Sequence, residues 1–559
     1  MDIASIALGG MTSGLTQSVF WIILTTFLYI KYTIDNYAAK NVPSEALMSS
    51  YDFIIVGGGS AAMEGGQCNW PRGKVIGGTS MLNYMLYVRG NKKDYDMWEQ
   101  LGNTGWSYDD VLQYFKKSED NQNTLHAETP YHSTGGYLSV DEPPWHTPLV
   151  TAWLEAGLEM GYENIDINGK QHAGFMVAQG TIKRGSRCSA AKAFLQPIRT
   201  RKNLHVVMEA HVTKILIDPS SKSAYGVEFI RDGKMLRVRA EKEVIVSAGS
   251  INSPQLLMLS GIGPKEQLSK HGIPVIQDLR VGHNLQDHVS VGGVSFLVDK
   301  EIALVESRIY NIQDMLGYAI FGDGPLTLPG GIEGVAFINS KFVNVSDDFP
   351  DIELILAAGA TCSDGGRSIW KAHGLTNKFY DAVYGEINNK DLWTALPILL
   401  RPKSKGFIAL RSSNPFDYPL IYPNYFEQPE DMATLVEGVK FVFEMSKTSA
   451  FQRYSSKMNP KPFPGCKNIS MYTDPYWECM IREYSMTIYH PTGTCKMGPI
   501  WDPEAVVDPR LRVYGVARLR VIDGSIMPNI ISGNTNAPII MIAEKGSDMI
   551  KEEWLKNKV

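Results

Sequence analysis

The segment Tyr51-Asp-Phe-Ile-Ile-Val-Gly-Gly-Gly-Ser-Ala-Ala62 decides the fold of this chain. Its apolar run, Phe53 to Val56, has the length of a buried β-strand and leads directly into three glycines. Glycines at the end of such a strand allow the backbone to approach the pyrophosphate of a dinucleotide. We therefore predict a nucleotide-binding turn that uses Gly57, Gly59 and Ser60.

The second half of this motif is missing from the sequence. A dinucleotide-binding turn normally opens a helix, and an acidic residue about 20 positions further on binds the ribose. Here the chain continues as Met63-Glu-Gly-Gly-Gln-Cys-Asn-Trp-Pro-Arg-Gly73, whose adjacent glycines and proline leave no helix of useful length. The only acidic residue soon after the turn is Glu64, and the next is Asp94. The cofactor-binding unit is therefore truncated after its first strand and turn.

Composition describes a large globular protein. The chain has 559 residues, of which 44% are hydrophobic and 20% charged, enough for a large core and more than one domain. Its 54 basic and 59 acidic residues leave a net charge of −5. Nucleic-acid-binding domains carry a basic patch or stripe, so this balance gives no indication of a nucleic-acid partner.

The apolar run from Val19 to Ile30 has the length of a signal-peptide core and is short for a membrane span. Residues 1 to 18 lack the Lys or Arg that normally precedes such a core, so an uncleaved anchor and a buried helix stay open as alternatives. Two glycosylation triplets begin at Asn344 and Asn468. We expect a secreted protein, or one anchored in a membrane on the lumenal side.

The six cysteines form neither a CxxC pair nor a spacing typical of zinc ligands, and we expect no metal site. Cys466 and Cys479 flank a turn-rich segment, Tyr472-Thr-Asp-Pro-Tyr476, which favours a disulfide between them in an exported protein. For the other four cysteines, disulfides and free buried thiols both remain open.

Further elements follow from local patterns. Alternating runs on both sides of Asp232-Gly233 predict a β-hairpin over 225–239. The strand 243–247 leads into a short helix that ends near Gly263, with Pro254 in its first turn. We also expect helical structure over 94–118 with turns at its two glycines, strands at 212–217 and 519–523, and a final helix that starts near Asn534.

In this order, the segments resemble the glucose-methanol-choline (GMC) oxidoreductase family. Residues 73–96 are similar to the first signature of the family, and residues 249–263 are similar to the second. Cys68-Asn-Trp-Pro-Arg-Gly-Lys74 resembles the insect FAD-dependent glucose dehydrogenase branch of that family. The resemblance covers almost everything from Tyr51 to the C-terminus.

The resemblance implies the catalytic residues. The family base lies in a His-Pro motif, which this chain matches at His490-Pro491, and its partner falls at Asn534. Oxidation of an alcohol requires removal of the hydroxyl proton as hydride leaves carbon, and histidine suits that step at neutral pH. An amide can hold the same oxygen without competing for the proton.

The resemblance also implies the cofactor, FAD. It places Thr79 and Asn83 at the flavin or its ribityl chain, Val212 beside the adenine, and Asp523 with Gly524 near the phosphates and ribityl. Some members of the family carry a histidine near the position of Asn83 that bonds covalently to FAD. Asparagine at this position implies noncovalent FAD, weakened by the truncation.

The implied fold is α/β, with a Rossmann-like FAD-binding domain interleaved with a substrate domain built on an antiparallel sheet. We expect a signal or anchor segment and linker at 1–45, and a discontinuous FAD-binding domain at 46–135, 200–295 and 500–559. The substrate domain would then take 136–199 and 296–499. Family members carry a helix, a strand and a further loop between the glycine turn and Asn69, so tens of residues are absent here. A splice variant or a faulty gene model explains this loss more simply than an adapted fold.

The implied function is oxidation of the CH-OH group of an alcohol or sugar, with hydride passed to the flavin and electrons to a quinone-like or other acceptor. The truncation puts the activity of this form in doubt. Two alternatives remain: a secreted, flavin-free, non-catalytic binding protein, and a lyase of the same family that uses FAD without net oxidation.

Overall fold

The computed structural model describes residues 25–26, 28–29, 41–44, 47–56 and 69–555 of the chain. Most of the predicted signal segment lies outside the described residues, as do Gly57, Gly59, Ser60 and Cys68. No helix in the described part is both long and apolar enough to cross a membrane.

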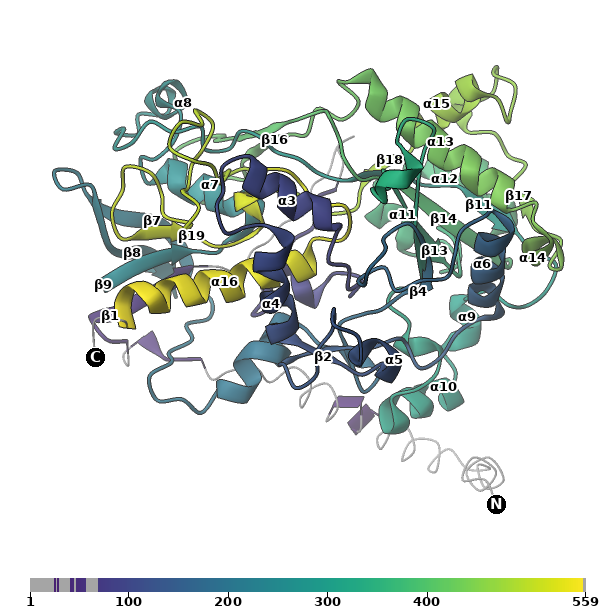
Figure 1. The fold of residues 1–559 in the computed structure, drawn as a ribbon, viewed down its shortest axis with the longest axis horizontal. Coiled ribbons are helices and arrows are strands. Elements are labelled where there is room, and N and C mark those ends of the chain that lie inside the picture. The colour runs from purple at the N-terminus through teal and green to yellow at the C-terminus, as the bar shows by residue number, and fades with distance from the viewer. Residues whose placement is uncertain (1–24, 27, 30–40, 45–46, 57–68, 556–559) are drawn as a thin grey trace.

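The first of two large sheets contains the strand that begins the cofactor motif (Figure 1). Parallel pairing joins the first and last of its strands to a long central strand, and an antiparallel hairpin extends the sheet on one side. The predicted hairpin is confirmed, and its turn at Asp232 and Gly233 has positive φ at both residues, as a tight hairpin turn requires. The strands are β1 (Ser50–Val56), β7 (His211–Asp218), β8 (Ser223–Arg231), β9 (Lys234–Val246) and β19 (Leu519–Val521).

Strand β1 is the edge of this sheet in the part of the chain that the structure describes, because it pairs only with β9. The side chain of Ile55 in β1 is 69% exposed. The first strand of a dinucleotide-binding unit is normally covered by the helix that follows it. Only twelve residues, 57–68, separate β1 from Asn69, fewer than a helix and a second parallel strand need.

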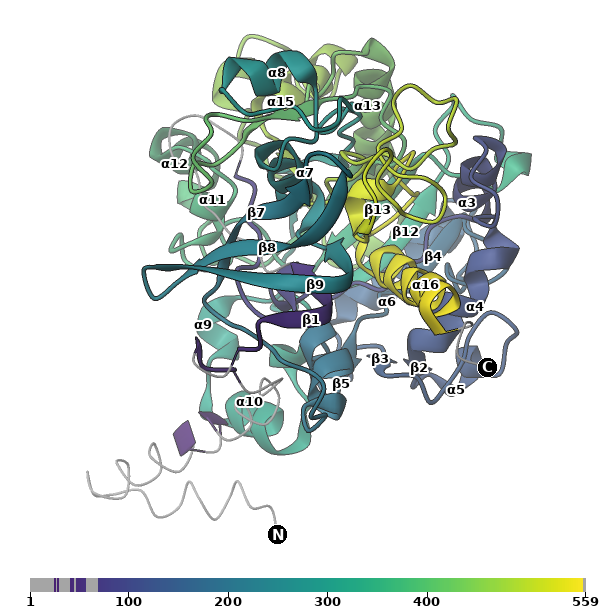
Figure 2. The ribbon, with the colours of Figure 1, turned by 90° about the vertical axis from the view of Figure 1, so that its left-hand side faces the viewer.

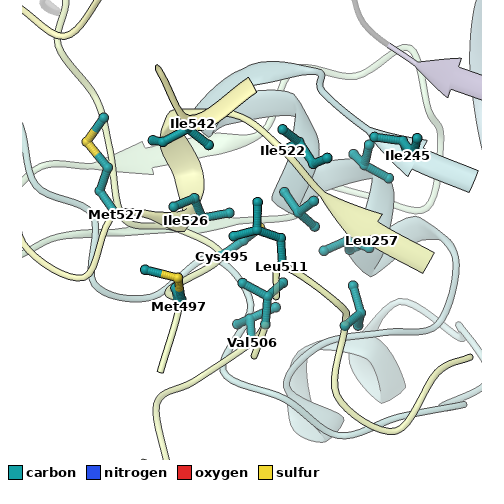
Figure 3. Close-up of a cluster of buried hydrophobic side chains, with 14 of the residues drawn as sticks. Ile245, Leu257, Cys495, Met497, Val506, Leu511, Ile522, Ile526, Met527 and Ile542 are labelled. Atoms are coloured by element: carbon teal, nitrogen blue, oxygen red, sulfur yellow. The ribbon is translucent and has the colours of Figure 1, made fainter. Parts of the chain in front are cut away.

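The first hydrophobic core surrounds this sheet and the helices that pack on it. Figure 3 shows Ile245 of β9, Leu257 of α7 and Ile542 of α16 meeting around the loop residues Cys495 and Leu511. The expected helices are confirmed, with the final one starting two residues after Asn534. Their bounds are α3 (Lys92–Gln100), α4 (Tyr108–Ser118), α7 (Gly249–Leu259) and α16 (Asn536–Leu555).

In the described part of the chain the second sheet has eight strands, all paired antiparallel. It lies at the opposite end of the molecule in Figure 1 and behind the first sheet in the view of Figure 2. A second hydrophobic core packs between one face of this sheet and the helices α6 (Pro148–Glu159), α13 (Pro429–Met445), α14 (Ser449–Gln452) and α15 (Asp474–Glu483). The strands are β4 (Gly174–Val177), β10 (Val289–Val291), β11 (Ser295–Leu297), β12 (Ile332–Ile338), β13 (Ile352–Ala357), β14 (Leu392–Leu399), β17 (Lys457–Met458) and β18 (Ser485–Thr487).

Shorter elements connect the two sheets. Three small two-stranded pairs comprise β2 (Glu119–Asn121) with β3 (Leu138–Val140), β5 (Ile182–Lys183) with β6 (Ser186–Arg187), and β15 (Phe407–Ala409) with β16 (Leu420–Tyr422). The remaining α-helices are α5 (Thr124–Ala127), α8 (Lys265–Lys270), α9 (Glu306–Ile309), α10 (Ile312–Leu316), α11 (Ile369–Ala372) and α12 (Asn377–Tyr384).

The predicted disulfide between Cys466 and Cys479 is present, and it closes a loop of sequence separation 13. Cys188, Cys362 and Cys495 are free and buried. In the described part of the chain no cluster of side chains could hold a metal ion. The predicted α/β class, with a partly parallel sheet beside an antiparallel one, is confirmed.

Candidate active site

The structure brings together the two residues predicted to act in catalysis. The side-chain amide nitrogen of Asn534 lies 3.4 Å from Nε2 of His490, although 44 positions separate them in the chain. His490 follows β18 of the antiparallel sheet, and Asn534 precedes α16, which packs in the first core. Both residues are buried, with exposures of 9% and 8%. The pair therefore sits where the two halves of the molecule meet.

A tight turn and a buried carboxylate hold His490. The preceding residue, Tyr489, has a φ of 67°, a left-handed conformation that costs a non-glycine residue about 1–3 kcal/mol. The backbone nitrogens of Tyr489 and His490 donate to Oγ1 of Thr487 at 2.8 Å and to Asp287 at 2.9 Å. Thr487 in turn donates to Asp287 at 2.5 Å, and the Tyr425 hydroxyl also donates to this carboxylate. These bonds offset the strain and orient the histidine.

Asn534 is held by the residues just before it. Gly533 has a φ of 149°, and a Cβ at this position would lie 2.5 Å from Cγ1 of Val88, so no larger residue fits. The hydroxyl of Ser532 accepts from Arg401 at 3.4 Å and donates to Asp94 at 2.9 Å. The segment before α16 is thereby tied to helix α3 and to the loop that follows Leu399 of β14.

His288 is a residue of the site that the sequence analysis missed. Its Nδ1 lies 2.9 Å from Nδ1 of His490, and its Nε2 lies 3.0 Å from the carbonyl oxygen of Leu400. The available signal was a histidine directly after Asp287, at the start of the alternating run Val289-Ser-Val291. That pattern indicates a strand but says nothing about the residue that the ring contacts.

Burial dominates the electrostatics of these groups. It lowers the pKa of His490 well below its usual range, and the neighbouring His288 lowers it further. Burial also lowers the pKa of His288 to about 4, although its interactions with the backbone of Leu400 and of Ile531 oppose the shift. The pKa of Asp287 is raised to about 7 by burial, against the opposing bonds from Thr487, Tyr425 and the His490 backbone. Both histidines are therefore neutral at pH 7.

The second glycine loop is folded onto the segment that includes Arg187. Asn83 accepts from Arg187 at 2.7 Å and from the backbone nitrogen of Met85 at 3.1 Å. Thr79, in the 3-10 turn η2 (Gly78–Met81), is exposed and accepts from the nitrogen of Gly73 at 3.3 Å. Within the described residues neither Thr79 nor Asn83 is hydrogen-bonded to His490 or Asn534. Their predicted contacts with the flavin stay predictions.

Val212, predicted to lie beside the adenine, lines a cavity of about 270 Å³ next to β1. Tyr51, Phe53, Ala248 and Asn252 form other parts of its wall. Ligand pockets are typically about 300–1,000 Å³, so this cavity accommodates one end of a dinucleotide and not a whole one.

Asp523 and Gly524 are buried, and Asp523 links the end of the last strand to α7 by hydrogen bonds. The Asp523 carboxylate accepts from the nitrogen of Gly249 at 2.9 Å, from the hydroxyl of Ser253 at 2.5 Å and from the nitrogen of Ser525 at 2.8 Å. A Cβ on Gly524 would lie 3.0 Å from Cδ1 of Ile539, which leaves little room for a side chain. Their predicted contacts with the phosphates and the ribityl chain of FAD stay predictions.

Two observations show that the described residues fit an FAD. Oδ1 of Asn534 is buried and has no hydrogen-bond partner among the described residues, as expected for an acceptor that faces a ligand. The cavity lined by Val212 lies next to β1, the strand that leads into the predicted nucleotide-binding turn. The turn that would bind the phosphates, Gly57 to Ser60, lies outside the described residues.

A partly parallel sheet beside an antiparallel sheet, with a buried His–Asn pair between them, is the arrangement expected for a dinucleotide-dependent oxidoreductase. Two family models, both described as GMC oxidoreductase, match residues 51–290 and 402–543. The chain belongs to the GMC oxidoreductase family.

Curated relatives and solved structures agree with this assignment. The chain is 43% identical over 493 residues to a glucose dehydrogenase [FAD, quinone] of Drosophila pseudoobscura pseudoobscura, covering 87% of this chain and 75% of the relative. It is 37% identical to an alcohol dehydrogenase [acceptor] of Pseudomonas putida, covering 86% and 82%. A structure of the formate oxidase of Aspergillus oryzae superposes with a TM-score of 0.76 at 26% identity, covering 94% of this chain and 92% of that one.

Proposed function

We propose that this chain is an FAD-dependent dehydrogenase that oxidises the CH-OH group of an alcohol or sugar, with His490 as the base. The observation that carries this proposal is the buried contact between Nε2 of His490 and the amide of Asn534. The glucose and alcohol dehydrogenases among the relatives support the substrate class. The similarity to the Drosophila glucose dehydrogenase [FAD, quinone] supports a quinone-like electron acceptor.

His490 takes the hydroxyl proton of the substrate at Nε2, which breaks the O–H bond and forms an N–H bond on the ring. The amide of Asn534 holds the substrate oxygen while its charge develops, which is the role of a preorganised donor. Burial of both residues excludes water from this step and strengthens these interactions. FAD, when bound, supplies the acceptor for the hydride that leaves carbon.

We further propose that FAD binds noncovalently and weakly. Asn83 lacks the nucleophilic nitrogen that a covalent flavin bond needs, and its side chain already accepts from Arg187. The exposed Ile55 in the edge strand β1 supports a loss of the structure that normally covers the adenine half. The same observation favours a second candidate, a flavin-free binding protein that retains the substrate domain.

A secreted or lumenal location is also a proposal. The apolar run from Val19 to Ile30 and the disulfide between Cys466 and Cys479 support it, because structural disulfides persist in oxidising compartments.

Turnover with saturating FAD tests the proposed function. The purified chain is mixed with excess FAD, a dye acceptor and either glucose or a simple alcohol, and dye reduction is followed. His490→Ala should lower turnover roughly 10²–10⁴-fold, the usual contribution of a general base. His271→Ala is the control, because His271 lies outside the site, where its Nε2 contacts the carbonyl oxygen of Leu410 at 3.1 Å.

The remaining outcomes separate the alternatives. Full turnover in His490→Ala would exclude His490 as the base. Absence of bound flavin and of turnover would favour the binding protein, and bound flavin without dye reduction would favour a lyase.

A further inference from the structure

The carbonyl oxygen of Leu400 determines where His288 carries its proton. Nε2 of His288 lies 3.0 Å from this oxygen, and a carbonyl oxygen can only accept a hydrogen bond. Nε2 of His288 is therefore protonated. Since burial lowers the pKa of His288 to about 4, the ring is neutral at pH 7 and its Nδ1 has a lone pair.

This lone pair in turn determines the tautomer of His490. The two Nδ1 atoms lie 2.9 Å apart, which is hydrogen-bonding distance. One of these nitrogens must therefore donate the hydrogen and the other must accept it. Because Nδ1 of His288 accepts, Nδ1 of His490 donates. A neutral His490 then has its lone pair on Nε2, the atom that faces Asn534. The reverse arrangement would place two lone pairs against each other at Leu400.

We propose that His288 is a positioning residue that locks His490 in the Nδ1-H tautomer and thereby presents an unprotonated Nε2 toward Asn534. The catalytic consequence rests on the proposed function, whereas the tautomer itself does not. His288 touches neither substrate nor cofactor in this scheme and acts only through His490.

The arrangement persists through proton transfer. When Nε2 of His490 takes the hydroxyl proton, the hydrogen bond from its Nδ1-H to His288 is unchanged. Nδ1 of His288 therefore remains the acceptor for the positively charged ring. In a catalytic triad the third residue orients the base through a hydrogen bond. His288 has that role here, with an imidazole in place of the usual carboxylate. Asp287, a titratable group beside His490, contacts the backbone nitrogen of His490.

Two nearly isosteric variants isolate the hydrogen bond. In His288→Asn the amide oxygen lies near the position of Nδ1 and accepts from His490. In His288→Leu no acceptor remains, while volume and burial stay similar. A merely structural role of His288 predicts similar behaviour of the two variants, because both lose the bond to Leu400.

Nitrogen-15 spectra of the flavin-free, 559-residue chain test the tautomer directly. The side chains of its eleven histidines are labelled, and the two signals of interest are assigned by their loss in His490→Gln and His288→Asn. We expect His490 to carry its proton on Nδ1 in the wild type and in His288→Asn, and a mixture of tautomers in His288→Leu. A wild-type His490 protonated on Nε2 would overturn the inference, even if His288→Leu fails to fold.

Kinetics with excess FAD give the second readout. We expect kcat to fall about 10²–10⁴-fold in His288→Leu, the range for loss of a correctly protonated base, with KM little changed and most activity restored in His288→Asn. Equal losses of kcat in the two variants would contradict the inference. If the wild type shows the expected tautomers but reduces no dye, the proposed function fails and this inference stands.

Discussion

Asp94, at the start of α3, binds Ser532 across 438 positions of the chain: the backbone nitrogen of Ser532 donates to one carboxylate oxygen at 2.7 Å and its hydroxyl donates to the other at 2.9 Å. The same carboxylate accepts from the backbone nitrogen of Asn91 and completes the cap of α3. One buried side chain thus caps a helix and anchors the segment that carries Asn534.

Replacement of this carboxylate should lower both stability and activity. Asp94→Ala leaves the buried donors of Ser532 and Asn91 without an acceptor, each at about 1–3 kcal/mol. We expect the free energy of unfolding in denaturant to fall by roughly 3 kcal/mol, and turnover to fall because Asn534 loses its anchor. Asp109→Ala is the control in the next helix, since the side chain of Asp109 is 88% exposed, and a change above about 0.5 kcal/mol there would question the comparison.

Glu353 in β13 should make stability depend on pH. It is fully buried beside Phe337 and Ile398, neither carboxylate oxygen has a partner among the described residues, and burial raises its pKa to about 8. The folded state therefore binds the proton more tightly than the unfolded state, whose pKa is about 4.3. The proton on Glu353 contributes fully to the free energy of unfolding below pH about 4.3. This contribution is lost as the pH rises to about 8, and the loss is on the order of 5 kcal/mol.

Glu353→Gln should remove this part of the pH dependence. The variant is expected to approach wild-type stability at acid pH and to exceed it by several kcal/mol at pH 8, as measured by denaturant unfolding across pH. Glu478→Gln is the control, because Glu478 forms a surface ion pair with Arg482. Its difference in unfolding free energy from the wild type should change little with pH. If the difference in unfolding free energy between Glu353→Gln and the wild type did not change with pH, the Glu353 carboxylate would have a hydrogen-bond or ion-pair partner.

FAD binding should be weak in this form of the chain. The absence of a ribose-binding acid alone removes a charged hydrogen bond of about 1.5–3 kcal/mol, and each 1.4 kcal/mol is about tenfold in affinity. We expect mostly apoprotein after purification and an apparent Kd in the micromolar range or weaker, with the Drosophila relative as the matched control.

Flavin fluorescence and circular dichroism on the recombinant chain measure this directly. A stoichiometric, tightly held flavin on a cooperatively melting protein would show that the fold closes over the gap after β1. Sequencing of the transcript across codons 61 to 65 would establish whether an exon has been omitted.

The disulfide between Cys466 and Cys479 should stabilise the second core. A crosslink over a loop of this size contributes about 3 kcal/mol by restricting the unfolded chain. The double substitution of both cysteines by serine should lower unfolding stability by this amount. Reductant should destabilise the wild type similarly and leave the double variant unchanged, and equal sensitivity of both proteins would show that the bond contributes nothing.

Expression through the secretory pathway should yield glycosylated protein. Asn344 and Asn468 are both exposed, so an oligosaccharide can be attached at either without disturbing the core. Endoglycosidase treatment should reduce the apparent mass, and Ser346→Ala with Ser470→Ala should abolish that shift. Unglycosylated protein found entirely in the cytosol would contradict the proposed location.

Local patterns were sufficient for much of the fold. The alternation around Asp232-Gly233 predicted the hairpin of β8 and β9, and the punctuated apolar run after Ala248 predicted α7. The turn-rich loop between Cys466 and Cys479 predicted the disulfide. These features are encoded within about 15 residues of chain, where backbone preference and hydrophobic period act directly.

Family membership and the His490–Asn534 pair were also accessible, because long motifs with fixed spacing carry them. The interruption of the cofactor motif after Gly59 was visible for the same reason, as a motif that stops halfway. Sequence alone therefore determined the class of protein, the candidate base and its partner, and the place where the cofactor unit is interrupted.

Only the tertiary structure decided which groups surround His490. His288 lies 202 positions from His490, and Asp94 lies 438 positions from Ser532, distances over which no periodicity or local motif acts. Their pairing depends on how the antiparallel sheet and the start of α16 pack against each other. The tautomer of His490 follows from a backbone carbonyl, that of Leu400, whose position no side-chain pattern specifies. Burial then makes these few hydrogen bonds decisive, because it keeps out the solvent that could replace them.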